Sequence, residues 1–247
     1  MSEVRLIPLG VGDAFSALRY TTCMALGVGD VWVLLDCPHP VRKMIREASN
    51  AAGIPLDLCD ISAVALSHLH ADHCSGLEDY AYFSHFALGR KATLLAHPDV
   101  STRLWPDVLS AGMDAPVSAP TTRETYFDVV DLDATRPVVF GPFSIECRPT
   151  IHSVPTTAFR IQAGDRLVGF SADTTFDPTL IDWLAPCDLI LHEATSEPTS
   201  PVHTPYARLA ELPDSIRRKM RLFHYHDDFD LASSLIEPLR QGHLYGV

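Results

Sequence analysis

The segment Ser67–His73, with the sequence SHLHADH, places four candidate metal ligands within six positions. These ligands are His68, His70, Asp72 and His73. An apolar run of strand length, residues 60–66, precedes the segment, and residues 74–81 after it can enter a helix. On such a strand-to-helix turn the first two histidines can reach one metal ion while the last two ligands face a second ion. Histidine and aspartate at this density have no packing role, so the spacing predicts a site for two metal ions.

The composition describes one globular domain with an ample core. The chain has 247 residues, of which 47% are hydrophobic, and no linker divides it. Its formal net charge of −12 argues against broad electrostatic binding to nucleic acid or to anionic membranes, and it favours a small substrate. We therefore expect a single domain over residues 1–247.

The sequence carries no signal for a membrane or for export. It has no apolar run of about 18 residues and no basic-then-apolar leader, which predicts a cytoplasmic protein without a membrane span. Its six cysteines are scattered without a Cys-x-x-Cys pair. Such spacing indicates reduced thiols in a core rather than a disulfide framework.

Strand-like runs dominate each half of the chain, and helical runs follow them. This pattern predicts an α/β fold in which two mixed β-sheets lie face to face with helices outside. A strand over residues 188–191 is expected to end just before His192. The pattern also predicts a loop over residues 110–122 and a closing helix over residues 230–240.

Polar residues stand at the ends of four more predicted strands. They are His152, Asp173, His192 and His224. If all these strand ends lie at one edge of the sandwich, their side chains converge on the Ser67–His73 turn. Two ligand groups then form, the first from His68, His70 and His152 and the second from Asp72, His73 and His224. The carboxylate of Asp173 can bridge the two ions.

The sequence leaves two alternatives for the last ligand and more than one for the metal. His226 lies two positions after His224 and shares a face of an extended strand with it, so it is the alternative last ligand. We prefer His224 because it follows the apolar run directly. A site rich in histidine suits two zinc ions, with manganese or iron as alternatives.

The His-x-His-x-Asp-His signature after a strand resembles that of the metallo-β-lactamase superfamily, whose fold is an αββα sandwich. This chain fills all seven ligand positions of that superfamily. Within it, the chain is most similar to the ribonuclease Z (ElaC-like) branch. The motifs that carry this similarity are residues 152–154 (HSV), 171–174 (SADT), 192–195 (HEAT) and 203–204 (HT).

The resemblance implies a dinuclear-metal-dependent hydrolase, and a phosphodiesterase in particular. A hydroxide held between two divalent ions is a nucleophile at neutral pH, and the ions take up charge on the attacked centre. Asp72 is therefore counted both as a ligand and as a catalytic residue. The resemblance gives His192 the role of protonating the leaving oxygen. Alternatively, His192 and His203 only support the ligands through hydrogen bonds.

Contacts with the substrate are expected from His203, Thr204 and Thr195. In tRNA-processing members of the branch a long arm grips the tRNA between the later histidine and the bridging aspartate. Here His152 and Asp173 are only 21 positions apart, and a predicted hairpin fills that interval. The chain is thus expected to act on a small phosphodiester, such as a cyclic nucleotide, or on a nucleic-acid end. Extended nucleic acid is a less favoured partner, and a homodimer is compatible with the sequence.

Two other functions remain open. Other branches with the same ligands hydrolyse esters, lactones or thioesters, reactions that have less need of His192. A non-hydrolytic iron-binding sensor ranks last, because such a site would usually carry a carboxylate where this chain has His70.

Overall fold

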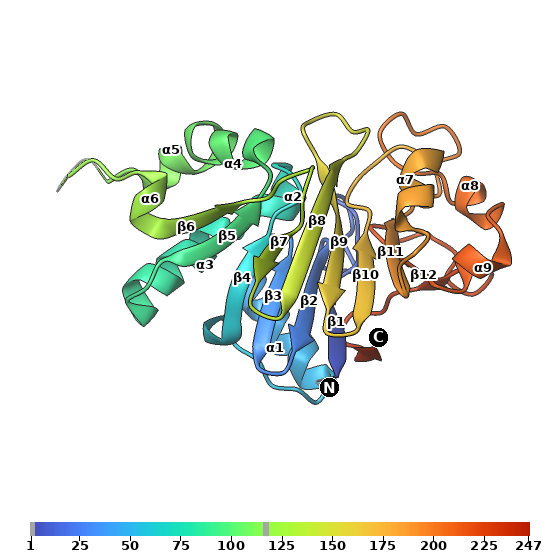
Figure 1. Cartoon of the computed structure of the whole chain (residues 1–247), viewed down its shortest axis with the longest axis horizontal. Helices are drawn as coiled ribbons and strands as arrows, with labels where there is room; N and C mark the ends of the chain where they lie inside the picture. The colour runs from blue at the N-terminus through green and yellow to red at the C-terminus, as the bar shows by residue number, and fades with distance from the viewer. Residues whose placement is uncertain (1–2, 116–118) are drawn as a thin grey trace.

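The computed structural model describes residues 3–115 and 119–247, and in this part of the chain two seven-stranded sheets lie face to face (Figure 1). The first sheet is formed, in spatial order, by β14 (Tyr245–Gly246), β1 (Val4–Gly10), β2 (Cys23–Val28), β3 (Val31–Leu35), β4 (Ile61–Ala65), β5 (Ala92–Ala96) and β6 (Phe127–Asp131). Its strands β3 to β6 run parallel to one another, whereas β14, β1, β2 and β3 alternate in direction.

The second sheet has the same mixed character. Its strands are, in spatial order, β13 (Glu237–Pro238), β12 (Met220–Phe223), β11 (Leu189–Glu193), β10 (Arg166–Phe170), β9 (Thr157–Ala163), β8 (Phe143–Pro149) and β7 (Val138–Phe140). Strands β10 to β13 are parallel, and β7 to β10 form an antiparallel meander. The predicted arrangement of two mixed sheets with helices outside is confirmed.

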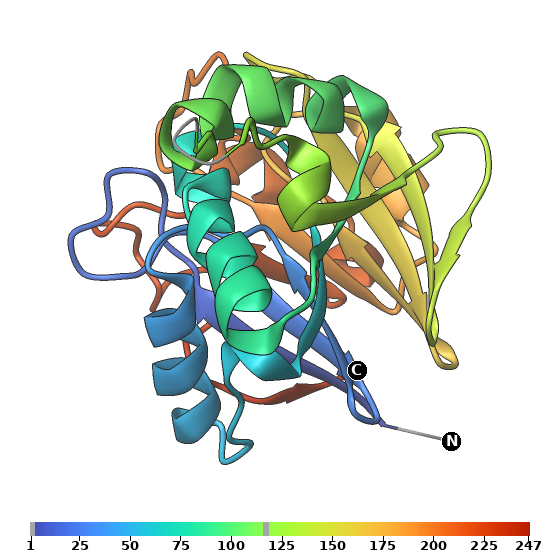
Figure 2. The ribbon, with the colours of Figure 1, turned by 90° about the vertical axis from the view of Figure 1, so that its left-hand side faces the viewer.

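Helices cover the outer faces of the sandwich. They are α1 (Val41–Ala51), α2 (Ala71–Cys74), α3 (Leu77–Tyr82), α4 (Pro98–Leu104), α5 (Ser110–Met113), α6 (Arg123–Tyr126), α7 (Pro178–Leu184), α8 (Tyr206–Ala210) and α9 (Asp214–Arg217). Figure 2 shows α1 and α3, in blue and teal, against the outer face of the first sheet. None of the described helices is long and apolar enough to cross a membrane.

Alternation along the strands builds two hydrophobic layers. In β1 and β2, Leu6 and Met24 point into the core between the sheets, while Ile7 and Ala25 point into the core beneath the helices. Successive side chains of a strand face opposite sides of the sheet, so the first sheet is covered on both faces. Packing on both faces therefore holds the strands of this sheet in place, and with them the side chains at the strand ends.

The predicted helix over residues 230–240 is wrong. The Asp230 carboxylate accepts hydrogen bonds from Ala232 N, Ser233 N and Ser233 Oγ, which fixes a turn in place of a helix. The chain then pairs with β12 through the short strand β13. The predicted loop over residues 110–122 holds α5 at its start, and residues 116–118 of that segment lie outside the described part.

Candidate metal centre

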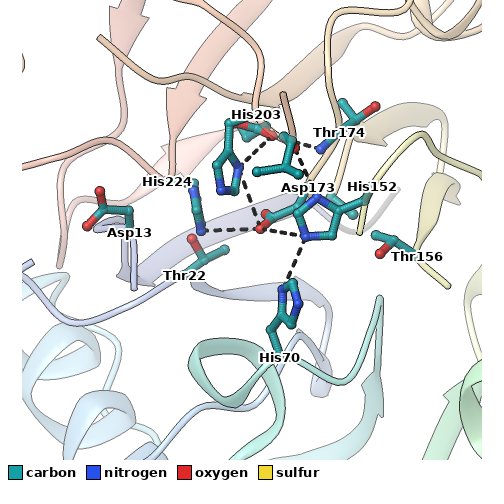
Figure 3. Close-up of polar contacts among 12 residues, drawn as sticks. Asp13, Thr22, His70, His152, Thr156, Asp173, Thr174, His203 and His224 are labelled. Carbon is teal, nitrogen blue, oxygen red and sulfur yellow. Dashed lines mark hydrogen bonds and ion pairs between the residues drawn. The ribbon is translucent and has the colours of Figure 1, made fainter. Parts of the chain in front are cut away.

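The carboxylate of Asp173 lies at the centre of a cluster of histidines (Figure 3). Its Oδ2 atom is 3.4 Å from Nε2 of both His73 and His224. The same oxygen is 3.8 Å from Nε2 of both His68 and His152. Because Asp173 is almost fully buried, at 1% exposure, this geometry is shielded from bulk water.

The cluster divides into two groups of ligand atoms, each with members within 4.8 Å of one another. The first group consists of His68, His70, His152 and Asp173, and the second of Asp72, His73 and His224. The structure therefore brings all seven predicted ligands together, in the two predicted groups. A further combination joins Asp173 and His224 to His203.

The turn after β4 separates the two groups as its sequence predicts. His70 has extended backbone angles (φ −67°, ψ 146°) and caps α2, which begins at Ala71. His68 and His70 therefore precede the helix, whereas Asp72 and His73 lie in its first turn. Asp72 Oδ2 is 3.2 Å from His73 Nε2 and 3.3 Å from His224 Nε2, so the second group is tightly assembled.

Unusual backbone conformations hold several strand ends at the cluster. Among the described residues the non-glycine positive φ angles are those of Asp36 (63°), Ala172 (50°) and His224 (57°). Each such residue costs about 1–3 kcal/mol and persists only where its surroundings enforce it. All three end a strand and adjoin or belong to the cluster, so strain is concentrated where the chain must turn a side chain towards the ligands.

Asp36, which the sequence analysis did not single out, supports the first turn from below. Its Oδ2 is 2.8 Å from His73 Nδ1, and its two oxygens accept hydrogen bonds from the N–H and hydroxyl of Ser67 at 2.8 and 2.9 Å. Ser67 Oγ in turn lies 2.9 Å from His68 Nδ1. One buried carboxylate thus orients a histidine of each ligand group. Its position directly after the apolar strand β3 was the available signal.

The donor set fits two divalent ions. His73 and His152 each use Nδ1 for a hydrogen bond, to Asp36 and to Val202 O, so that the Nε2 lone pair can face an ion. His73 Nε2 and Asp173 Oδ1 are buried and have no hydrogen-bond partner among the described residues. Orphaned buried polar atoms are costly, and coordination would satisfy both of these.

Burial and mutual charge shift the pKa values of the ligands. Burial holds the pKa of His68 well below its usual value and so favours the neutral ring that a metal needs. Burial alone would raise the pKa of Asp72, but hydrogen bonds from His224 and His73 lower it on balance. Burial opposes the charged form of His224, yet Asp173 and Asp72 raise its pKa to about 9. Without a metal, a proton on His224 therefore balances the charge of the Asp72 and Asp173 carboxylates.

His203 and Glu193 form a pair beside the ligands. His203 Nδ1 is 3.1 Å from Glu193 Oε1 and 3.9 Å from Asp173 Oδ2. Glu193 is fully buried and also accepts a hydrogen bond from Thr174 N at 2.7 Å. Burial opposes protonation of His203, but the hydrogen bond that its ring donates to Glu193 raises the pKa of His203 on balance. His203 thus lies at the site, with its ring oriented by a carboxylate.

The structure places His192 outside both ligand groups. Strand β11 runs two residues further than expected and ends at Glu193, so His192 and Glu193 point to opposite faces of the sheet. Glu193 faces the cluster, whereas the His192 ring is buried with Nδ1 2.7 Å from Glu193 O. Burial lowers the pKa of His192 to about 4, so its ring is neutral at pH 7. Among the described residues the ring makes no hydrogen bond to a candidate ligand, so this geometry does not support a role for His192 as proton donor or as ligand support.

The other predicted residues divide in the same way. Thr204 is fully buried and donates a hydrogen bond to Thr174 O, which makes its role structural. The His226 side chain is 44% exposed and pairs with Asp228 at 2.9 Å, so the structure favours His224 over His226 as the last ligand. Thr195 lines a cavity at the cluster together with His203 and His224.

This cavity, the recess beside the cluster, has a volume of about 250 Å³, and one of the seven candidate ligands, His224, is among its lining residues. Asp13 and Glu197 also line it. Figure 3 shows Asp13 on the side of His224, away from His70 and His152.

A sequence model of the family described as Anti-Pycsar protein Apyc1 matches residues 4–242. The Anti-Pycsar protein Apyc1 of Paenibacillus sp. (strain J14) is 29% identical over 98% of this chain and 98% of its own length. That of Paenibacillus harenae is 30% identical over 97% of this chain and 98% of its own length.

Solved structures share the fold at low sequence identity. The metallo-β-lactamase fold protein YhfI from Bacillus subtilis has a TM-score of 0.78 and 20% identity, covering 99% of this chain and 100% of its own. Unliganded yeast PDE1 has a TM-score of 0.76 and 12% identity over 100% of both chains. Human tRNase Z, short form (ELAC1), has a TM-score of 0.69 and 16% identity over 98% of both chains.

The predicted resemblance to the ribonuclease Z branch therefore holds as a likeness of fold. The family match, in contrast, spans nearly the whole chain and carries a different description. The chain has a metallo-β-lactamase fold and belongs to the Anti-Pycsar protein Apyc1 family.

Proposed function

We propose that this protein is a dinuclear-metal-dependent phosphodiesterase that acts on a small phosphodiester such as a cyclic nucleotide. The observation that carries the proposal is the position of Asp173 Oδ2 between two groups of histidine nitrogens, within 3.4–3.8 Å of four of them. A carboxylate placed in this way suits a bridge between two divalent ions.

The ligand groups would hold the two ions, which we propose to be zinc. Nitrogen-rich sites with one or two carboxylates suit zinc, and iron or manganese would be accepted by the same atoms. Zn(2+)-bound PqqB from Methylobacterium extorquens shares the fold, with a TM-score of 0.74. When bound, two such ions would supply the activated nucleophile and the positive charge that phosphodiester hydrolysis needs.

His203 is proposed to protonate the leaving oxygen. The alkoxide of a nucleotide leaves poorly without a proton, so a general acid beside the reacting phosphate is needed. Glu193 holds Nδ1 of His203, while Nε2 of the ring makes no hydrogen bond with the described residues. The buried carboxylate thus fixes the ring and favours its protonated form, in the same recess as the ligand groups.

The size and charge of the recess favour a small substrate. Ligand sites for drug-sized molecules are commonly about 300–1,000 Å³, and this recess of about 250 Å³ is at the small end. The interval between His152 and Asp173 is filled by the hairpin of β9 and β10, which turns at Gly164 with φ of 58°. The formal charge of −12 does not suit a long polyanion.

The names of related proteins are consistent with this reaction. A diphosphatase from the PhnP family shares the fold with a TM-score of 0.73, and the yeast neighbour is named PDE1. At identities of 16% and 12% these proteins show the fold alone. The proposal of a phosphodiesterase reaction therefore rests on the geometry of the ligand groups and of His203.

The decisive experiment joins metal analysis to a substrate panel. Protein purified without chelator should carry close to two equivalents of metal and should hydrolyse cyclic nucleotides or bis-(p-nitrophenyl) phosphate. A lactone and a thioester complete the panel. Turnover of either of those two substrates without any phosphodiester hydrolysis would assign the protein to acyl hydrolysis, and one tightly held ion at saturation would reject the dinuclear site.

A further inference from the structure

The aromatic ring of Phe15 lines the recess and is exposed to solvent. Phe15 lines the same cavity as His203 and His224, yet 85% of its surface is exposed. A large apolar side chain held in water gains nothing from the hydrophobic effect in the free protein. Its position at the site therefore calls for a ligand that covers it.

The loop that carries Phe15 is held in one conformation. Asp13 Oδ1 accepts a hydrogen bond from Phe15 N at 3.0 Å. Asp227, from the far end of the chain, accepts hydrogen bonds from four groups of the loop: Ser16 Oγ, Ala17 N, Leu18 N and Arg19 Nη1. A pair of one-residue bridges also ties Gly12 to Thr21 and to Tyr225. The exposed ring is thus presented by a braced loop.

The charge around the ring excludes a second phosphate as its partner. Asp13 and Glu197 line the recess, and no lysine or arginine is among the described residues that line it. A phosphate at this rim would meet two carboxylates without a neutralising cation. A planar, uncharged group with hydrogen-bond donors, such as a nucleobase, would instead find an aromatic face and two acceptors.

We propose that Phe15 is a specificity-determining residue on which the base of a mononucleotide substrate stacks while its phosphate lies at the ligand groups. The inference rests on the proposed phosphodiesterase function and deepens it by naming the part of the substrate that is recognised. Stacking on an aromatic ring tolerates different bases because every base has a π face.

Kinetics with matched substrates test the inference. The first substrate is a 3′,5′-cyclic nucleotide, and the second is methyl riboside 3′,5′-cyclic phosphate, which has the same phosphodiester but no base. Loss of a base stack typically costs about 5- to 100-fold in affinity. Phe15→Ala should raise KM for the nucleotide by this factor, with little change in kcat, and should leave the substrate without a base unaffected. Phe15→Trp should restore a low KM.

Leu18→Ala is the matched control, because Leu18 belongs to the same loop and is 77% exposed but does not line the recess. It should leave both substrates unaffected. Equal losses for both substrates in Phe15→Ala would overturn the inference. A change in the molecular mass of the Phe15→Ala protein in solution, with KM for the nucleotide unaltered, would also overturn it and would assign the ring to a contact between copies of the chain.

A binding measurement separates this inference from the proposed function. Calorimetric titration of metal-loaded His203→Ala protein with a cyclic nucleotide reports binding while turnover is slowed by about 10²–10⁴-fold. Weaker binding after the added Phe15→Ala change would support the inference, even if the wild-type protein hydrolysed no phosphodiester and the proposed function failed. Unchanged binding, in a protein that hydrolyses cyclic nucleotides, would reject the inference alone.

Discussion

The Oδ2 atom of Asp36 lies 2.8 Å from Nδ1 of His73, and neither side chain is exposed to solvent. This contact fixes the side of the ring that faces Asp173. Through Ser67 the same carboxylate also reaches His68, so both ligand groups depend on a residue that belongs to neither group.

Replacing Asp36 with asparagine should therefore weaken metal binding without removing a ligand. Both oxygens of Asp36 accept hydrogen bonds, whereas the amide of asparagine has a single oxygen that can accept. At least one of the hydrogen bonds from His73 and Ser67 is therefore lost. Changes of this kind cost about 10- to 100-fold in metal affinity, which a competition titration with a chelator would measure. Asp79→Asn, at an exposed carboxylate that bonds His39, is the control and should bind metal normally. Normal affinity in Asp36→Asn would show that packing alone orients the rings.

The last ligand can be identified by a pair of alanine substitutions. His224→Ala should lose most of one metal equivalent and nearly all activity, because Nε2 of His224 contacts both Asp72 and Asp173. His226→Ala removes an exposed ring that pairs with Asp228 and should keep both ions and normal turnover. Atomic absorption together with phosphodiesterase rates would check both variants. The opposite pattern would move the ligand assignment to His226.

Metal affinity should rise with pH across the neutral range. In the metal-free protein Asp173 and Asp72 overcome the effect of burial and raise the pKa of His224 to about 9, so the ring is protonated at pH 7. A metal must displace this proton, and binding at pH 7 should release protons that a weakly buffered titration can detect. Affinity should level off above about pH 9. Affinity that is independent of pH between 7 and 9 would contradict this reading.

The same pKa shift sets the stability of the metal-free protein. A folded-state pKa raised above the unfolded value contributes stability that is fully present below the unfolded pKa, near 6.5, and lost as pH rises through the folded value, near 9. Chemical denaturation of the metal-free protein should therefore show a falling free energy of unfolding between these pH values. His224→Gln should flatten that slope.

The convergence of the seven candidate ligands could be predicted because the ends of the strands can be located in the sequence. Where an apolar run is followed by a histidine or aspartate, the polar side chain lies at the edge of the sheet. This holds even if the exact last residue of the strand is not known. His152, Asp173 and His224 were found in this way. The strained backbone at Ala172 and His224 could not be predicted, because a positive φ is normally signalled by a glycine and neither position is a glycine.

His203, the proposed proton donor, could not be predicted in the same way, because its partner on β11 depends on which face of that strand points to the site. Side chains alternate along a strand, so the choice between His192 and Glu193 turns on a single position of register. His203 arrives on a loop after β11, where no periodicity places it. The contribution of Asp36 is also a matter of tertiary contact, since its partners lie more than 30 positions away.

Glu193 should tune the pH dependence of the reaction rather than its metal content. Glu193→Gln keeps an acceptor for His203 Nδ1 but removes the charge that raises the pKa of that ring. The alkaline limb of the pH–rate profile on a nucleotide diester should therefore move to lower pH. Two equivalents of metal should remain bound. A loss of metal with no shift of the profile would mean that Glu193 only supports Asp173 and His224.

The reaction class is tested most sharply by the leaving group. A p-nitrophenolate ion leaves without a proton, whereas the ribose alkoxide of a nucleotide diester needs one, so an acid matters only for the second substrate. His203→Ala should slow hydrolysis of the nucleotide diester by about 10²–10⁴-fold and slow bis-(p-nitrophenyl) phosphate far less.

His192→Ala is the matched control for His203→Ala, because it removes a buried histidine on the face of β11 opposite to Glu193, whose ring hydrogen-bonds to the backbone carbonyl of Glu193. It should lower stability but spare the ratio of the two rates. If His192→Ala changed that ratio and His203→Ala did not, the proton would come from the buried ring after all. Equal losses on both substrates in His203→Ala, with both ions retained, would show that this histidine binds the phosphate without protonating the leaving oxygen.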